Sequence, residues 1–270
     1  MLNTSYTYSV DGGILALKDL VLPTQLFCLG QTVVSKGTLI IFEEAIWTRA
    51  RCRRNVDTSL NLIYGINDRL ALEVVVPAVA QRTCSEHSSG LGDISAQLEW
   101  AFYQYSKKEK EDWQATVLAA VLLPTGSICK SPETGFGSTS VLLGTTGSFL
   151  TPLWYLFYST GGILTTTNNQ QTKFGNTILY EAGVGRSLYT AKKYLLFAFI
   201  ECNGILERPT RISGILQEDT GNHVLFVGPS FFFSTQHATL QIGIQGPITQ
   251  TIPNPSKISF RLGLSVSWFF

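Results

Sequence analysis

The sequence predicts an all-β protein: a 12-stranded antiparallel up-and-down transmembrane β-barrel with a short N-terminal arm. Three observations predict this fold. The chain is 44% hydrophobic but only 14% charged, whereas soluble globular proteins carry roughly 25% charged residues. Apolar residues alternate with small polar ones along most of the chain, which is typical of strands with one apolar face. Short and long connections also alternate, as in barrels with turns at one rim and loops at the other.

The lengths of the apolar runs exclude a helical membrane protein. The longest runs are residues 115–123 and 74–80, whereas a spanning helix needs about 18–20 residues. Only helices and closed barrels pair every backbone polar group inside a bilayer. A soluble sandwich also has alternating strands, but its outer face is normally densely charged. Here the polar face consists mostly of Ser, Thr, Asn, Gln and Gly, which favours a barrel with a polar lumen.

We expect residues 1–36 to form an arm at the periplasmic rim or inside the lumen, and residues 37–270 to form the barrel. The expected strands are 37–49, 56–66, 69–81, 91–105, 113–124, 137–148, 152–164, 175–189, 193–202, 221–234, 238–247 and 256–270. The short connections are 67–68, 106–112, 149–151, 190–192 and 235–237. The connections expected to be mostly longer are 50–55, 82–90, 125–136, 165–174, 203–220 and 248–255.

Aromatic residues cluster near the short connections, where amphipathic rings at headgroup level form a girdle. The alternative is that these are core aromatics of a sandwich. The residues are Tyr64, Phe102, Tyr105, Trp113, Trp154, Tyr155, Tyr189, Tyr194, Phe233 and Trp268.

Three motifs resemble the outer-membrane family known as the meta-pathway phenol-degradation or transporter family. They are GINDRL at 65–70, GLGD at 90–93 and LPTG at 123–126. The resemblance covers about residues 37–270 and implies a small outer-membrane channel for small or aromatic compounds, without catalytic residues. The end of the last strand, Trp268, Phe269 and Phe270, is similar to the aromatic-ended signal read by the barrel-assembly machinery.

Four charged residues fall on the polar faces of expected strands: Glu73, Glu99, Glu181 and Arg261. We expect them to face the lumen, because a lipid-facing Arg or Lys costs roughly 2–4 kcal/mol at the midplane. They would act either as a solute filter or as a structural ion-pair network. Glu43 and Glu44 are adjacent and must point to opposite faces, so we expect one of them near the rim or at a bulge.

The first expected loop holds a basic run, Arg49, Arg51, Arg53 and Arg54. These side chains either bind anions, including lipopolysaccharide phosphates, or form a solvated loop. Four cysteines map to the long-loop rim or its edge, and Cys28 lies in the arm. The disulfide candidates are Cys52, Cys84, Cys129 and Cys202; free thiols are the alternative. No Cys/His spacing suggests a metal site.

The predicted function is passive passage of small solutes, including aromatic or hydrophobic ones, across the bacterial outer membrane. The expected partners are the lipid bilayer, lipopolysaccharide, the outer-membrane assembly machinery and the small-molecule solute. A net charge of +1 argues against nucleic-acid binding, and no cofactor is expected.

Two alternatives remain. One is a structural or surface-interaction protein with disulfide-stapled loops. The other is a lipid-modifying enzyme, which needs a Ser–His pair with an orienting Asn. His87, His223 and His237 lie at expected loops or turns without such a spacing, so we do not expect an enzyme.

Overall fold

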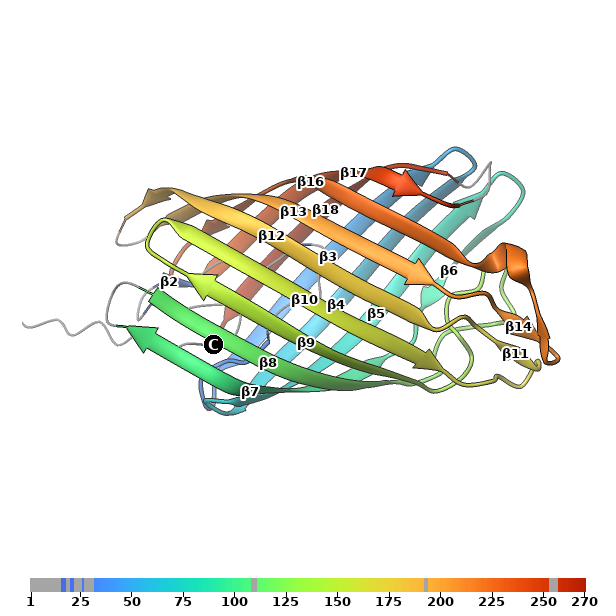
Figure 1. The fold of residues 1–270 in the computed structure, drawn as a ribbon, viewed down its shortest axis with the longest axis horizontal. Coiled ribbons are helices and arrows are strands. Elements are labelled where there is room, and N and C mark those ends of the chain that lie inside the picture. Colours follow the sequence, from blue (N-terminus) through green and yellow to red (C-terminus); the bar gives the residue numbers. More distant parts are fainter. Residues whose placement is uncertain are drawn as a thin grey trace, which may run out of the picture.

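The computed structural model describes residues 16–17, 20–21, 26, 32–107, 111–191, 194–252 and 257–270. In this part of the chain, twelve long strands form one closed antiparallel barrel (Figure 1). They are β3 (Leu39–Ala50), β4 (Arg53–Asn67), β5 (Leu70–Thr83), β7 (Ser95–Lys107), β8 (Glu111–Leu122), β9 (Ser140–Leu150), β10 (Trp154–Thr165), β12 (Thr177–Thr190), β13 (Leu195–Glu207), β16 (Asn222–Ser234), β17 (Ala238–Gln250) and β18 (Ile258–Phe269).

Each long strand pairs with its neighbours in the chain, and the pairing of β18 with β3 closes the ring. The predicted fold class is therefore confirmed, with strand ends that differ from the predicted ones by a few residues. Closure removes the free sheet edges, which a bilayer cannot solvate. Within the described residues, no helix has the length and apolar character needed to cross a membrane.

The two rims of the barrel differ in their connections. Short turns lie at one rim, which we call the short-turn end and which also holds the end of β18 (Figure 1). The other rim, the loop end, carries five short elements. They are β6 (His87–Leu91), β11 (Thr172–Lys173), β14 (Arg211–Ile212), β15 (Ile215–Leu216) and the 3-10 helix η1 (Glu218–Thr220). The sequence predicts these five segments only as parts of loops. Two further short strands, β1 (Ala16–Leu17) and β2 (Leu20–Val21), precede the barrel in the chain and pair with each other.

Two expected connections are wrong. Residues 50–55 are not a longer loop, because only Arg51 and Cys52 separate β3 from β4. Residues 203–220 are not loop throughout, because β13 continues to Glu207 and β14 and β15 follow. In both places, pairing with neighbouring strands extends the sheet through residues whose local sequence lacks clear alternation.

The alternation of side chains separates an apolar outer wall from a mixed inner wall. On β4, Leu60, Leu62 and Tyr64 are 36–48% exposed on the outside, whereas Asn61 and Ile63 are at most 3% exposed inside. Successive side chains of a strand point to opposite faces, so a closed sheet sorts them between lipid and lumen. The outward apolar rows predicted from the sequence are present.

Nine of the ten predicted girdle aromatics are exposed, and one is not. The exposed rings are Tyr64, Phe102, Tyr105, Trp113, Trp154, Tyr189, Tyr194, Phe233 and Trp268. Tyr155 is only 2% exposed, because it follows the outward-facing Trp154 on β10 and therefore points inward. Its assignment to the girdle was wrong, since closeness to a turn does not determine which face a residue takes.

Two of the sequence motifs meet at the loop end. The Asp93 carboxylate accepts hydrogen bonds from the backbone N–H of Gly126 at 2.8 Å and of Phe136 at 2.6 Å. The Thr125 hydroxyl donates to the Gly92 carbonyl at 2.8 Å. The GLGD motif therefore anchors the loop that begins in LPTG.

Candidate functional site in the barrel lumen and at the loop-end rim

The structure places all four predicted lumen residues on the inner wall. Glu73, Glu99, Glu181 and Arg261 are each 9% exposed or less, on β5, β7, β12 and β18. Each is held by neighbouring polar side chains. The Glu73 carboxylate accepts a hydrogen bond from Gln97 at 3.2 Å, and Glu181 accepts one from the Ser159 hydroxyl.

Glu99 is the centre of a network that reaches beyond the barrel strands. One carboxylate oxygen accepts bonds from the Thr32 backbone N–H at 2.8 Å and the Thr32 hydroxyl at 2.6 Å. The other accepts the Thr116 hydroxyl, whose oxygen lies 2.6 Å from that of Thr146. Both oxygens therefore accept hydrogen bonds. The segment before β3 is therefore fixed to the inner wall at β7.

Arg261 is held by amides and an aromatic ring. Its guanidinium donates to Gln245 Oε1, at 2.8 Å from Nε, and to Asn203 Oδ1, at 3.0 Å from Nη2. It also lies 4.1 Å from the centre of the Phe226 ring. This geometry fixes the position of one cation on the inner wall.

Two further glutamates of the inner wall were not among the predicted lumen residues. Glu201 of β13 is fully buried and accepts a hydrogen bond from the Ser230 hydroxyl. Glu44 of β3 lies in register with Ser59 of β4 and Ser265 of β18. Large apolar residues occupy both faces of β13, so alternation there did not show which face is the inner one.

The prediction that Glu43 or Glu44 lies near the rim or at a bulge is wrong. The pairing of β3 with β4 and β18 continues without a register shift at both residues. Glu44 faces inward, and Glu43 points out in register with Leu60 and Val266, away from the rim. An ordinary strand thus carries a carboxylate on the apolar outer wall.

A group of large inward side chains fills part of the short-turn end. This aromatic cluster consists of Leu150, Tyr155, Phe157, Leu195, Phe197, Phe199 and Phe232, all at most 7% exposed. Gly183 and Gly185 of β12 provide space for it, because a Cβ atom at either position would overlap the rings of Phe157 and Phe199. Sequence reasoning expected a lumen of small polar groups and missed this apolar region.

A second inward cluster contains part of the segment before β3. This arm cluster consists of Val34, Ile40, Ile63 and Ala71, with Phe42 and Phe269 packed against it. The Lys36 backbone N–H bonds Asp68 Oδ1 at 3.0 Å, and Gly37 N–H bonds the Gly65 carbonyl at 2.8 Å. Residues 32–38 are therefore held at the GINDRL motif.

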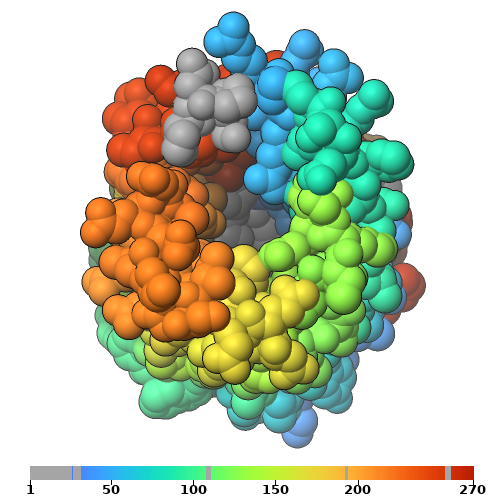
Figure 2. Space-filling view, turned by 90° about the vertical axis from the view of Figure 1, so that its right-hand side faces the viewer, coloured from blue at the N-terminus to red at the C-terminus, as the bar shows by residue number. Residues whose placement is uncertain are grey.

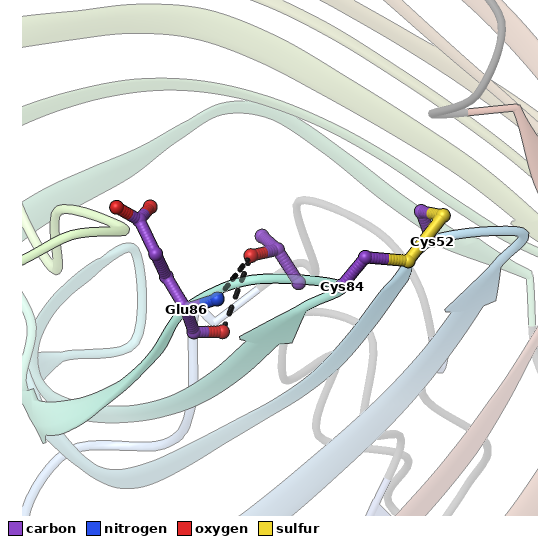
Figure 3. Close-up of a disulfide and its surroundings, with 4 residues drawn as sticks. Cys52, Cys84 and Glu86 are labelled. Atoms are coloured by element: carbon purple, nitrogen blue, oxygen red, sulfur yellow. Dashed lines mark hydrogen bonds between the residues drawn. A yellow bond between two sulfur atoms is a disulfide. The ribbon is translucent and has the colours of Figure 1, made fainter.

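One disulfide joins two of the four candidate cysteines, at the loop end. Cys52, in the turn between β3 and β4, is bonded to Cys84, just beyond β5, with Cα atoms 5.1 Å apart (Figure 3). Cys129 and Cys202 are free thiols, so their assignment to disulfides was wrong. Cys202 lies within β13, whose extension moved it from the rim into the barrel wall. Cys28 lies outside the described residues.

The four arginines of the basic run point in different directions. Arg49 and Arg54 lie opposite each other on β3 and β4 and face outward, and Arg51 lies in the turn between these strands. Arg53 takes the inner side, and its guanidinium donates to Gln81 Oε1 at 2.6 Å. The expected loop is a strand end, where neighbouring residues alternate between faces.

The remaining predicted residues also have defined positions. On β18, Trp268 is exposed, Phe269 packs against the arm cluster, and the backbones of Phe270 and Leu39 exchange two hydrogen bonds. His223 Nε2 lies 2.6 Å from the Tyr180 hydroxyl. Among the described residues, no group of three His, Cys, Asp or Glu side chains could hold a metal ion.

The sequence matches a family model described as "Putative MetA-pathway of phenol degradation", over residues 30–268. The chain belongs to this family. A search of curated proteins gave no match.

Two solved structures share the fold. An outer-membrane channel from Pseudomonas putida F1 is 16% identical, with a TM-score of 0.74, over 88% of this chain and 97% of that one. The NanC porin is 8% identical, with a TM-score of 0.52, over 84% of this chain and 98% of that one. Together with the apolar outer wall, the shared barrel fold makes this a protein of the bacterial outer membrane.

Proposed function

We propose that the protein is a passive channel for small solutes, including aromatic or hydrophobic ones, and has no catalytic activity. The observation that carries the proposal is a closed barrel whose inner wall bears polar, charged and aromatic side chains. The loop-end face is hollowed at its centre and ringed by several segments of the chain (Figure 2). The fold likeness to a channel and a porin supports the same role.

The lumen charges suggest a preference for cations. On the described inner wall between the rims, the carboxyl groups of Glu44, Glu73, Glu99, Glu181 and Glu201 outnumber the one guanidinium, Arg261. Fixed charges inside a barrel tune its selectivity. In this proposal the carboxylates attract cationic solutes, while the aromatic cluster provides an apolar surface on the same route.

We further propose that the N-terminal arm narrows the lumen from the periplasmic side. The contacts of Thr32 with Glu99 and of Val34 with the arm cluster support this role. Deleting residues 1–31 and replacing Thr32 with Val should then raise conductance.

Planar-bilayer recording of the purified full chain tests the channel. We expect discrete conductance with a reversal potential that favours cations. The triple variant Glu73→Gln, Glu99→Gln, Glu181→Gln should reduce this preference, whereas Glu43→Gln, the same change on the outer wall, should leave it unaltered. The absence of conductance and solute flux, with and without the arm, would refute the channel.

The disulfide supports a second candidate, a surface-interaction protein whose stapled rim binds a partner. Cys52 and Cys84 tie two neighbouring connections of the loop end together. If this were the main role, flux would be absent, and reduction of the disulfide would change adhesion or envelope integrity.

A further inference from the structure

Three arginines stand side by side on the outer wall at the loop end. Arg49 of β3 lies opposite Arg54 of β4, Arg54 lies opposite Arg82 of β5, and Arg82 lies opposite His87 of β6. Directly opposed residues share one face of a sheet, with Cβ atoms about 4.5–5.5 Å apart. All four side chains are exposed. We call them the arginine row; Arg82 and His87 were not predicted, because they are distant from the basic run in sequence.

The row is electrostatically unbalanced. No carboxylate among the described residues bonds the guanidinium of Arg49, Arg54 or Arg82. Like charges directly opposite each other destabilise a sheet. A bridging anion removes this cost, and the planar guanidinium matches a phosphate group with two parallel hydrogen bonds.

The row lies at the boundary between apolar and polar surface. One step toward the barrel centre, on the same face, Trp47, Val56 and Ala80 stand in register. The Trp47 ring packs edge-on against Phe260, with centroids 5.4 Å apart. Tryptophan prefers the headgroup region of a bilayer. The guanidiniums just beyond it therefore lie at the level of lipid phosphates.

An apolar groove lies on the same strands two register steps from the row, beyond Trp47, Val56 and Ala80. It has a volume of about 350 Å³, with the small residues Ala45, Thr58 and Ala78 in its floor and Leu91 and Leu264 among its apolar walls. The Thr58 hydroxyl is satisfied, because it donates to the Ala78 carbonyl at 3.1 Å.

Glu43 lies at the end of this groove that is farther from the row, one register step beyond Ala45. Its carboxylate therefore leaves the part of the groove nearest the arginines apolar.

We propose that the arginine row and this groove bind a phosphorylated glycolipid of the outer leaflet, that is, the lipid A part of lipopolysaccharide. The guanidiniums bind a lipid A phosphate, and an acyl chain lies in the groove. The disulfide supports this arrangement, because Cys52 lies between the strands of Arg49 and Arg54 and Cys84 follows the strand of Arg82. A rigid rim lowers the entropic cost of binding. The site is independent of whether the barrel conducts.

Binding of fluorescently labelled bis-phosphorylated lipid A to the purified full chain tests the site. We expect Arg54→Gln to weaken binding about tenfold, since it removes charge-assisted hydrogen bonds to phosphate. Two controls carry the same substitution: Arg53→Gln on the inner side of β4, and Arg186→Gln, whose guanidinium stacks on Trp154 at the short-turn end. Both should stay within about twofold of the parent. Unchanged binding by Arg54→Gln, or an equal loss in either control, would overturn the proposal.

Two further measurements identify the ligand and guard against misfolding. Dephosphorylated lipid A should bind weakly, and millimolar inorganic phosphate should not displace the labelled lipid; displacement by inorganic phosphate would overturn the lipid assignment in favour of a free-anion site. Ala78→Phe fills the groove without changing any charge and should also weaken lipid A binding. If Arg54→Gln does not fold, unchanged binding by Ala78→Phe refutes the site.

Discussion

The aromatic cluster and the arm cluster fill two parts of the same short-turn end by different means. In the aromatic cluster, β9, β10, β13 and β16 supply seven large inward side chains of their own. In the arm cluster, the wall offers small residues such as Gly65 and Ala71, and Val34 from the segment before β3 packs against it. One part of the inner wall is thus self-filled, whereas the other receives a separate piece of chain.

The difference shows that side-chain size, not only the alternation of polarity, shapes the interior of this barrel. A narrow barrel is filled by its inward side chains. Where these are small, the space they leave can admit another segment. The aromatic cluster should therefore contribute mainly to the stability of the barrel, and the arm cluster mainly to the position of the arm.

The largest expected effect is in the aromatic cluster. Phe232→Ala should lower the free energy of unfolding by about 3–5 kcal/mol, because it leaves a cavity among packed rings. The measurement is urea unfolding of the detergent-solubilised protein, followed by tryptophan fluorescence. Phe233→Ala is the matched control, since this neighbouring ring is 39% exposed on the outer wall, where lipid or detergent fills the space. Equal losses for the two variants would show that the cluster is not a packed unit.

Gly65→Ala tests the arm cluster. A Cβ atom at this position would overlap the backbone carbonyls of Val34 and Ser35. We expect this overlap to destabilise the native packing of residues 32–38 by about 1–3 kcal/mol, which is typical of overpacking. Displacement of these residues would relieve the overlap. Limited proteolysis would detect the displacement as new cleavage within residues 32–38. Gly246→Ala is the control, because no atom lies within 4 Å of the added methyl group. An arm that stays protected in Gly65→Ala would contradict the tight contact.

The smallest effect is expected at the anchor of the arm. Thr32→Val removes the hydroxyl bond to Glu99 but keeps the backbone N–H bond. We therefore expect the free energy needed to detach this segment from the inner wall to fall by about 1 kcal/mol. Hydrogen exchange of the Thr32 segment measures it. The control is Thr38→Val, because the described bonds of Thr38 are made by its backbone. Similar exchange rates in the two variants would mean that the Glu99 network does not hold the arm.

The sequence determined the barrel itself. Alternation, charge depletion and the order of short and long connections predicted all twelve long strands, because each property is local and a closed sheet has only two faces. The same alternation placed Glu73, Glu99, Glu181 and Arg261 inside, because the residues next to each of them in its strand are mostly apolar and point outward.

The tertiary structure alone decided which distant residues meet. Arg82 joins Arg49 and Arg54 through strand register, Cys52 is bonded to Cys84 rather than to another cysteine, and Thr32 contacts Glu99 of β7. On β13 both faces are apolar, so only closure of the ring showed that Glu201 points inward. The physical reason is that the alternation of residues along one strand determines which face of the sheet a side chain takes. The register between strands and the curvature of the wall determine which other side chains it contacts.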